Sequence, residues 1–383
     1  MMFSARSKRS LMRAVVAKDV PIYVQFYITA RCNLTCQQCN IIFANADVRE
    51  CTLAEIERIA ENLARVGVAI VLLTGGEPFV RQDLPGIIRA FESRGIHVRM
   101  QTNGLAREEE IARAVEAGGR DISISLDTLD EPKQDRINGG FPGSWRRALE
   151  AIAAFTRHLP REDSFASLGC VLQRDNVRDI PEVIRFGTSI GWYTSLVPVH
   201  VAPLSEPRGF RTFDADQRFT RDDFGAVDAL LEEVRLMRDR GLLLYDSDQY
   251  LDDIGRFVRG EPVTWRERHG GVCDTPNLYF AILPNGRWAP CCDHRIDRPV
   301  YVQDDGFPEV YRRKDFRAEV RTVAAACEGC MYGSYPEMTI SMRYFGATVQ
   351  RMRTFIARPP RKPWPLTGGD VMAAAARLRG AAV

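Results

Sequence analysis

The sequence predicts an α/β fold, a partial (β/α)6 TIM-like barrel followed by a small domain made of a β-hairpin and helices. Six short β-like runs alternate with amphipathic helical patterns between residues 22 and 240, which is typical of parallel βα units. Two further β-like runs flank Asn285-Gly286, a strong hairpin signal. The 383 residues exceed one ordinary compact domain but suit a large barrel with an appendage.

The predicted elements follow one another in a regular order. In a parallel barrel, the loops at the carboxyl ends of the strands form the active site. The predicted strands are 24–30, 69–76, 97–104, 121–127, 165–172 and 193–200, and the predicted helices are 53–66, 83–95, 107–119, 144–159, 179–191 and 221–240. The predicted segments are a basic extension (1–21), the barrel (22–240), a helical connector (241–272), the hairpin domain (273–342) and a basic Pro- and Ala-rich tail (343–383).

Composition places the chain among water-soluble globular proteins. Apolar residues make up 45% and charged residues 27% of the chain, which are ordinary values. No run reaches the roughly 18 apolar residues of a membrane span, and the basic start lacks the apolar centre of a signal peptide. We therefore expect a cytoplasmic protein.

Positive charge gathers at the two ends of the chain. Residues 1–20 carry five Lys or Arg against one Asp, and residues 343–383 carry eight against one, although the net charge of the whole chain is only +2. Such ends are able to make peripheral contact with an anionic membrane. The simpler expectation is that both are solvated, partly disordered tails. No aromatic-rich basic module is present, so we expect no stable nucleic-acid partner.

Ten cysteines are many for a cytosolic chain, and most of them fall into two groups. Clustered cysteines without an export signal favour metal binding over disulfides. Cys32, Cys36 and Cys39 follow the first predicted strand. A structural zinc site needs a fourth nearby Cys or His, and the following residues supply no His. Three thiolates on an iron–sulfur cluster leave one iron open, as a catalytic metal requires.

CxxxCxxC after the first strand of a βα barrel resembles the radical S-adenosylmethionine (SAM) superfamily. The resemblance implies that Cys32, Cys36 and Cys39 hold a [4Fe–4S] cluster whose fourth iron binds SAM. It also implies reductive cleavage of SAM to a 5′-deoxyadenosyl radical, with a flavodoxin- or ferredoxin-type electron donor. Relatives usually carry an aromatic residue before the last cysteine, near the adenine, whereas this chain has Gln38.

The resemblance extends to later strand ends, and each residue there has a simpler structural interpretation. "LLTGGEP" resembles the motif that binds the SAM amino group in this family, which assigns Gly75, Gly76 and Glu77 to the cofactor; alone, it is also a plain strand-to-loop turn. Polar cofactor contacts carry over to Asn103, Ser125 and Asp127, which otherwise serve as capping or turn residues. Arg136 in "DRINGG" is expected near the SAM carboxylate or in a surface ion pair.

A second cysteine group comprises Cys273, Cys291, Cys327 and Cys330. A CxxC pair directs two sulfurs at one metal or cluster, and four thiolates close a coordination sphere. The hairpin and the late "CEGC" resemble the twitch form of the SPASM extension, which implies a second, auxiliary [4Fe–4S] cluster. The alternative is a zinc ribbon with the same ligands. Cys292 and His294 are alternatives to Cys291 as a ligand.

Two further residues have speculative catalytic roles. Cys170, in the fifth predicted strand, is a thiol hydrogen donor if it points into the barrel, and a small packed residue otherwise. His200, at the end of the sixth predicted strand, lines a substrate site or satisfies the core.

The sequence therefore predicts a radical SAM oxidoreductase or maturase acting on a small-molecule or peptide substrate. One hypothesis is two-electron oxidation or rearrangement in natural-product or cofactor biosynthesis, and a second is cross-linking or side-chain oxidation of a precursor peptide. A zinc-stabilised, non-catalytic binding protein is the remote alternative.

Overall fold

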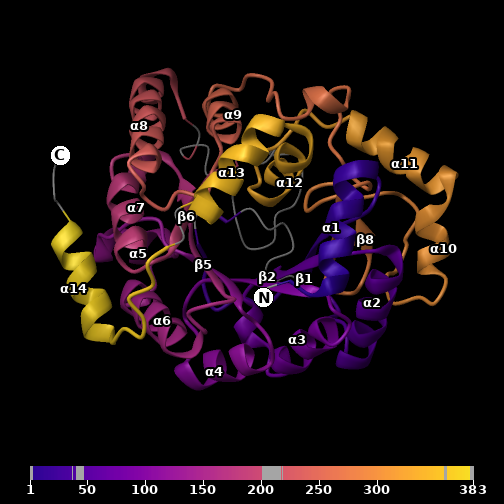
Figure 1. The fold of residues 1–383 in the computed structure, drawn as a ribbon, viewed down its shortest axis with the longest axis horizontal. Helices are drawn as coiled ribbons and strands as arrows, with labels where there is room; N and C mark the ends of the chain where they lie inside the picture. Colours follow the sequence, from indigo (N-terminus) through magenta and orange to yellow (C-terminus); the bar gives the residue numbers. More distant parts are fainter. Residues whose placement is uncertain are drawn as a thin grey trace.

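The chain forms one twisted sheet wrapped by helices in the computed structural model (Figure 1). The model describes residues 3–36, 38–39, 47–200, 217, 219–357 and 360–379. The strand order in the sheet is β6-β5-β4-β3-β2-β1-β7-β8. The strands are β1 (Tyr23–Thr29), β2 (Ile70–Gly75), β3 (His97–Thr102), β4 (Asp121–Ser125), β5 (Phe165–Leu172), β6 (Tyr193–Pro198), β7 (Tyr279–Ile282) and β8 (Trp288–Ala289).

Strands β1 to β6 are parallel to their neighbours throughout. Helices alternate with them along the chain, which confirms the predicted partial (β/α)6 barrel. The helices of these units are α2 (Leu53–Val66), α3 (Leu84–Glu92), α4 (Glu108–Glu116), α5 (Glu131–Ile137), α6 (Ser144–His158), α7 (Ile180–Ser189) and α8 (Arg221–Asp239). Helix α5 is an addition that the hydrophobic pattern did not predict, because it is short.

Local sequence signals explain where α2 begins and ends. Thr52 and Glu55 form a capping box at its first turn, and Gly67 ends it in a left-handed conformation at φ 103°. Its buried positions Ile56, Ile59 and Leu63 recur at helical spacing and face the sheet. This is the pattern from which the helix was predicted.

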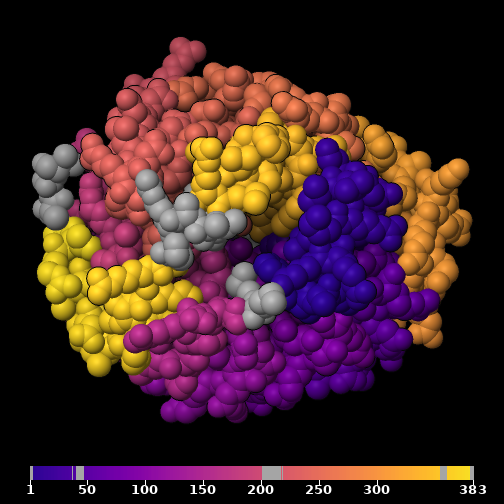
Figure 2. All heavy atoms as spheres, in the orientation of Figure 1, coloured from indigo at the N-terminus to yellow at the C-terminus, as the bar shows by residue number. Residues whose placement is uncertain are grey.

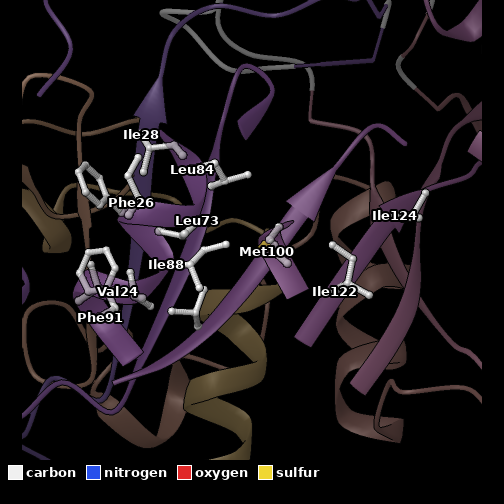
Figure 3. Packing of buried hydrophobic residues seen from close by; sticks show 14 of the residues in the cluster. Val24, Phe26, Ile28, Leu73, Leu84, Ile88, Phe91, Met100, Ile122 and Ile124 are labelled. Atoms are coloured by element: carbon white, nitrogen blue, oxygen red, sulfur yellow. The ribbon is translucent and has the colours of Figure 1, made fainter. Parts of the chain in front are cut away.

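The main core lies between the sheet and the outer helices (Figure 3). Alternate strand residues such as Phe26, Leu73 and Met100 point to this side and are fully buried. The opposite face of the strands encloses the barrel lumen, and it is polar in the middle of the sheet. Gln101 is exposed there although β3 is a central strand, and Ser125 is partly exposed. The lumen is therefore open and polar at its carboxyl end.

The predicted hairpin belongs to the same sheet as the barrel. β7 pairs antiparallel with β8 across the Asn285-Gly286 turn and parallel with β1 on its other side. Gly286 has φ 83°, a conformation that favours glycine. The strand that leads into the first cysteine group is thus the direct neighbour of the hairpin that carries Cys291. Hydrogen bonding therefore ties the two cysteine groups to adjacent strands.

The described residues of both chain ends fold onto the barrel, unlike the expected solvated tails. In α1 (Ala5–Ala17), the Ser7 hydroxyl lies within hydrogen-bond distance of the carbonyls of Ala69 (2.9 Å) and Gly95 (2.7 Å). Trp364 is 1% exposed and donates its indole N–H to the carbonyl of Ile190 at 2.8 Å. In Figure 2, α1 and the helices near residue 350 lie on the same face of the molecule.

The remaining helices follow the barrel. None of the helices in the described ranges is long and apolar enough to cross a membrane. They are α9 (Asp248–Val258), α10 (Phe307–Arg312), α11 (Lys314–Ala325), α12 (Ser334–Arg343), α13 (Phe345–Ala357) and α14 (Gly368–Leu378).

Candidate active site

Glycines bring the end of β2 against the end of β1. The N–H of Gly76 donates to the carbonyl of Thr29 at 2.9 Å, and the N–H of Glu77 donates to that of Arg31 at 2.8 Å. A Cβ on Gly75 would lie 2.3 Å from the Thr29 oxygen, and one on Gly76 would lie 2.0 Å from the Arg31 oxygen. Only glycine permits this approach, which places Glu77 beside the chain that enters the first cysteine loop.

Glu77 is a buried carboxyl group, with 1% of its surface exposed. Oε1 accepts hydrogen bonds from the N–H of Phe79 (3.0 Å) and the hydroxyl of Thr102 (2.7 Å), and Oε2 accepts one from the N–H of Asn103 (2.7 Å). Burial raises the pKa of Glu77 from 4.5 to about 7, and these hydrogen bonds oppose the rise. Three of the roughly four acceptor positions of the carboxylate are thus occupied, and one is left on Oε2.

Asn103 connects the end of β3 to the cysteine loop. Its side-chain Nδ2 donates to Oδ1 of Asn33 at 2.7 Å, and its Oδ1 accepts from the N–H of Leu105 at 3.0 Å. Asn33 directly follows Cys32. The predicted residues Gly75, Glu77 and Asn103 therefore meet beside the first cysteine.

Gln38 and Asp127 form a second link, on the β4 and β5 side of the barrel. Nε2 of Gln38 donates to Oδ2 of Asp127 at 2.8 Å, and Oδ1 of Asp127 accepts from the N–H of Val171 at 2.7 Å. Asp127 is fully buried, and burial raises its pKa from 3.8 to about 6. Asp127 thus holds the cysteine loop through Gln38.

The segment after α5 contacts the cysteine loop. The Cys36 thiol donates to Oδ1 of Asn138 at 3.8 Å, and Nδ2 of Asn138 donates to the hydroxyl of Ser144 at 2.9 Å. A Cβ on Gly139, at φ 86°, would lie 2.3 Å from the Thr35 hydroxyl. Residue-type arguments missed Asn138; its signal was the "NGG" that ends the "DRINGG" motif.

Ser125 and Arg136 have weaker placements. Ser125 ends β4 opposite Gly169 and is partly exposed toward the lumen. Arg136 is exposed on α5, and the described residues include no ion-pair partner for it. Its approach to a cofactor carboxylate stays a prediction.

The placements of Cys170 and His200 favour structural roles. Cys170 is fully buried in a cluster with Ile180, Ile184 and Leu230, on the helix side of β5 and away from the lumen. Nε2 of His200 accepts from the N–H of Met331 at 3.0 Å, and burial lowers the pKa of His200 from 6.5 to about 3.

Electrostatic interactions link the four thiols of the second group. Burial raises the pKa of Cys273 to about 12, and the nearby Cys291 and Cys327 contribute to the rise. Burial also raises the pKa of Cys330, again with contributions from Cys291 and Cys327. The four thiols therefore share one neighbourhood, although they come from three separate stretches of the chain.

The alternative ligands lie in the same place. Cys292 is buried and donates a hydrogen bond to Cys291, which lowers the pKa of Cys291 to about 7. A hydrogen bond to Cys327 raises the pKa of His294 to about 9. Cys292 also contacts the phenol of Tyr27 in β1. Cys292 thus lies between the thiol group and the barrel lumen.

Side chains from other segments contact the CxxC segment. The indole N–H of Trp265 donates to the carbonyl of Cys330 at 3.0 Å, and Nη1 of Arg266 donates to that of Cys327 at 2.8 Å. The ring of His200 stacks on Tyr332, with centroids 3.8 Å apart. His200 is therefore a support for the chain after Cys330.

Both thiol groups suit a soft metal centre by the chemistry of their donors. In the described ranges, no three His, Cys, Asp or Glu side chains stand in the arrangement that holds a single metal ion. At the first group, the buried Oε1 of Gln38 has no hydrogen-bond partner among the described residues. An unpartnered buried acceptor next to three partly exposed thiols fits a site that receives a further ligand.

Comparison with known proteins identifies the family. The sequence model of the radical SAM superfamily matches residues 26–187 of this chain. A probable GTP 3′,8-cyclase of Pyrococcus horikoshii is 38% identical over 272 residues, which are 70% of this chain and 83% of that protein. The chain belongs to the radical SAM superfamily. Membership implies a [4Fe–4S] cluster and SAM, so the three cysteines and the strand-end residues are the chain's candidates for holding them.

Other known proteins share part of the sequence or the fold. A PqqA peptide cyclase of Bradyrhizobium diazoefficiens is 29% identical over 173 residues, 45% of this chain and 44% of that protein, so the match spans less than half of this relative. Streptococcus suis SuiB bound to S-adenosylmethionine has a TM-score of 0.60 at 17% identity, over 86% of this chain and 79% of that chain. Native anSMEcpe with bound AdoMet and the Cp18Cys peptide has a TM-score of 0.57 at 14% identity, over 94% of this chain and 95% of that chain.

We expect SAM affinity to rise with pH in a Glu77-dependent way. An amino group donates more strongly to a carboxylate than to a carboxylic acid, and Glu77 ionises near its raised pKa of about 7. Calorimetry on oxidised protein, which leaves SAM intact, should show a Kd that falls between about pH 6 and about pH 8. Glu77→Gln should bind about tenfold more weakly at the upper pH and lose the slope.

Glu92→Gln is the matched control for this measurement. Glu92 accepts from the N–H of Val98 at 2.9 Å, and burial raises its pKa, but it lies at the opposite end of the strands. This variant should keep the wild-type slope. If the Kd for SAM still falls with pH in Glu77→Gln, Glu77 is not the group that binds the SAM amino group.

Proposed function

We propose that this enzyme carries a second, auxiliary [4Fe–4S] cluster and uses it in a two-electron oxidation of a peptide substrate. The supporting observation is the position of the second thiol group. Cys273, Cys291, Cys327 and Cys330 gather beside β7, which pairs with β1. Four thiolates leave no open position on a cluster. The group is therefore suited to electron transfer, whereas the three-thiol group keeps a position for SAM.

The oxidation needs two separate acceptors. A SAM-derived radical supplies hydrogen-atom abstraction at the first cluster. A substrate carbon that loses its hydrogen atom retains an unpaired electron; when that electron leaves for the auxiliary cluster and a proton leaves from a neighbouring O–H, N–H or S–H, a closed-shell product remains. The contact between Cys292 and Tyr27 in β1 supports this role, because such a substrate radical would form in the lumen, toward which Tyr27 points.

The charge pattern of the lumen supports a peptide over a nucleoside triphosphate. Two arginines on this side of the fold lie beside carboxylates that offset their charge, Arg99 with Asp121 at 3.6 Å and Arg351 with Glu337 at 2.9 Å. A triphosphate needs several cations whose charge is not offset in this way, whereas a neutral polar chain suits the serine- and glutamine-rich middle of the sheet. The similarity to a PqqA peptide cyclase agrees with this choice, and the similarity to a GTP 3′,8-cyclase supplies the competing candidate.

The two substrate classes are separable in one experiment. Reduced enzyme and SAM are incubated with short peptides encoded beside its gene and, in parallel, with GTP. We expect a peptide product lighter by two hydrogen atoms, one 5′-deoxyadenosine per product, and unchanged GTP. Converted GTP with unchanged peptides would contradict the peptide assignment. A product that keeps all its hydrogen atoms would contradict the two-electron oxidation.

A further inference from the structure

Gln38 is the residue at which this chain departs from the aromatic pattern of its relatives, and it carries an unused hydrogen-bond acceptor. Its Nε2 donates to Asp127 at 2.8 Å. Its Oε1 is buried and has no partner among the described residues. A buried polar atom without a partner destabilises the fold, so the unpartnered Oε1 indicates a ligand that supplies a donor.

Asp127 fixes the direction in which Gln38 presents this acceptor. Both carboxylate oxygens of Asp127 are occupied, Oδ1 by the N–H of Val171 and Oδ2 by Gln38. If the Gln38 amide turned over, Oε1 would face a carboxylate oxygen, and two acceptors would meet. The amide is thus held with Nε2 toward Asp127 and with Oε1 away from it.

The position of Gln38 decides which end of SAM it meets. Glu77, the candidate for the amino group, follows β2, whereas Asp127 and Val171 belong to the β4 and β5 side of the sheet. A ligand anchored by its amino-acid end at β2 reaches β4 and β5 with its nucleoside end. The donors on that end are the adenine amino group and the ribose hydroxyls.

We propose that Oε1 of Gln38 accepts a hydrogen bond from the nucleoside part of SAM, and that Asp127 is the positioning residue that holds Gln38 in this orientation. The inference rests on SAM binding at the first cysteine group. It replaces a direct cofactor contact of Asp127 with an indirect one. It also gives Gln38 a polar recognition role that an aromatic side chain cannot perform.

The first test measures binding of unreactive analogues by calorimetry to the protein with reconstituted clusters. Gln38→Ala and Gln38→Phe should each weaken S-adenosylhomocysteine binding by about three- to tenfold. If the donor is the adenine amino group, S-inosylhomocysteine, which has a carbonyl oxygen in its place, should bind both variants at least as tightly as it binds the wild type. If the donor is a ribose hydroxyl, the 2′- or 3′-deoxy analogue should instead bind both variants and the wild type equally.

The second test uses Asp127→Asn. If Asp127 had a purely structural role, this substitution would not change which analogue the protein prefers. The carboxamide introduced by this substitution offers an N–H donor, so Gln38 can turn its own amide over and present Nε2 to the ligand. With the amino group as donor, the preference should invert, and S-inosylhomocysteine should bind this variant more tightly than S-adenosylhomocysteine. With a ribose hydroxyl, which both donates and accepts, affinity for S-adenosylhomocysteine should be kept within about threefold.

Gln82→Ala, at an exposed glutamine after the 3₁₀ turn Pro78–Val80, is the control and should bind every analogue as the wild type does. Equal binding of S-adenosylhomocysteine by wild type, Gln38→Ala and Gln38→Phe would overturn the inference alone. Failure of the wild type to bind any analogue would overturn SAM binding at this site as well.

Discussion

Replacing Cys36 with alanine should abolish SAM cleavage and leave the chain folded. The side chain is only partly buried, and its thiol donates a hydrogen bond to Oδ1 of Asn138, so its replacement leaves the main core intact. Two remaining thiolates hold the open cluster poorly, and the loss of cleavage should exceed the roughly hundredfold effect typical of changes around a metal site. 5′-Deoxyadenosine formed after reduction is the quantity to measure.

Cys51→Ala is the matched control for this variant. Cys51 follows the same loop but is 2% exposed and packs in the main core. The Cys51→Ala variant should be less stable than the wild type but should keep its iron content and its SAM cleavage. Equal SAM cleavage by Cys36→Ala and the wild type would remove Cys36 from the cofactor site.

Replacing Cys327 with alanine should have the opposite pattern, with SAM cleavage retained and the oxidised product lost. Cys327 belongs to the second thiol group and lies close enough to Cys273 and Cys330 to contribute to the raised pKa of both thiols. Iron should fall from about eight to about four atoms per chain. The ratio of product to 5′-deoxyadenosine measures this uncoupling directly.

Cys292→Ala tests the neighbouring thiol against Cys291. If Cys291 is the ligand, this variant should keep about eight irons per chain, because Cys292 then only donates a hydrogen bond. A loss of about four irons would make Cys292 the ligand.

If Cys36→Ala and Cys327→Ala lose SAM cleavage alike, the proposed division of roles between the first and the second thiol group is contradicted.

Strand and helix positions of the barrel were predictable because they follow local periodicity. The alternation in β3 and the capping residues of α2 are visible within a few positions of the sequence. Pairing between distant strands leaves no such mark. The hairpin was expected in a separate domain, yet β7 pairs with β1, about 250 residues earlier. Likewise, a basic composition at residues 5–17 did not reveal that Ser7 would be buried under the strand starts.

The candidate site was predictable to the extent that its residues carry motifs. The cysteines and Glu77 stand at fixed spacings after strands, and the fold brings Glu77 and Asn103 together at one rim. The supporting contacts depend on side-chain geometry across distant segments. The "NGG" motif marks the loop at Asn138 but not its contact with Cys36, and nothing local indicated that Asp127 would accept a hydrogen bond from Gln38.

The most direct measurement of the central claim is electron paramagnetic resonance of the anaerobically reconstituted and reduced enzyme, recorded with and without SAM and combined with iron and zinc analysis. Two distinct clusters of different ligation predict about eight irons per chain, no stoichiometric zinc, and two overlapping [4Fe–4S] signals of which only one changes when SAM is added. About four irons with one zinc, or a single signal, would contradict the auxiliary cluster. Two signals that both ignore SAM would contradict the open site at Cys32, Cys36 and Cys39.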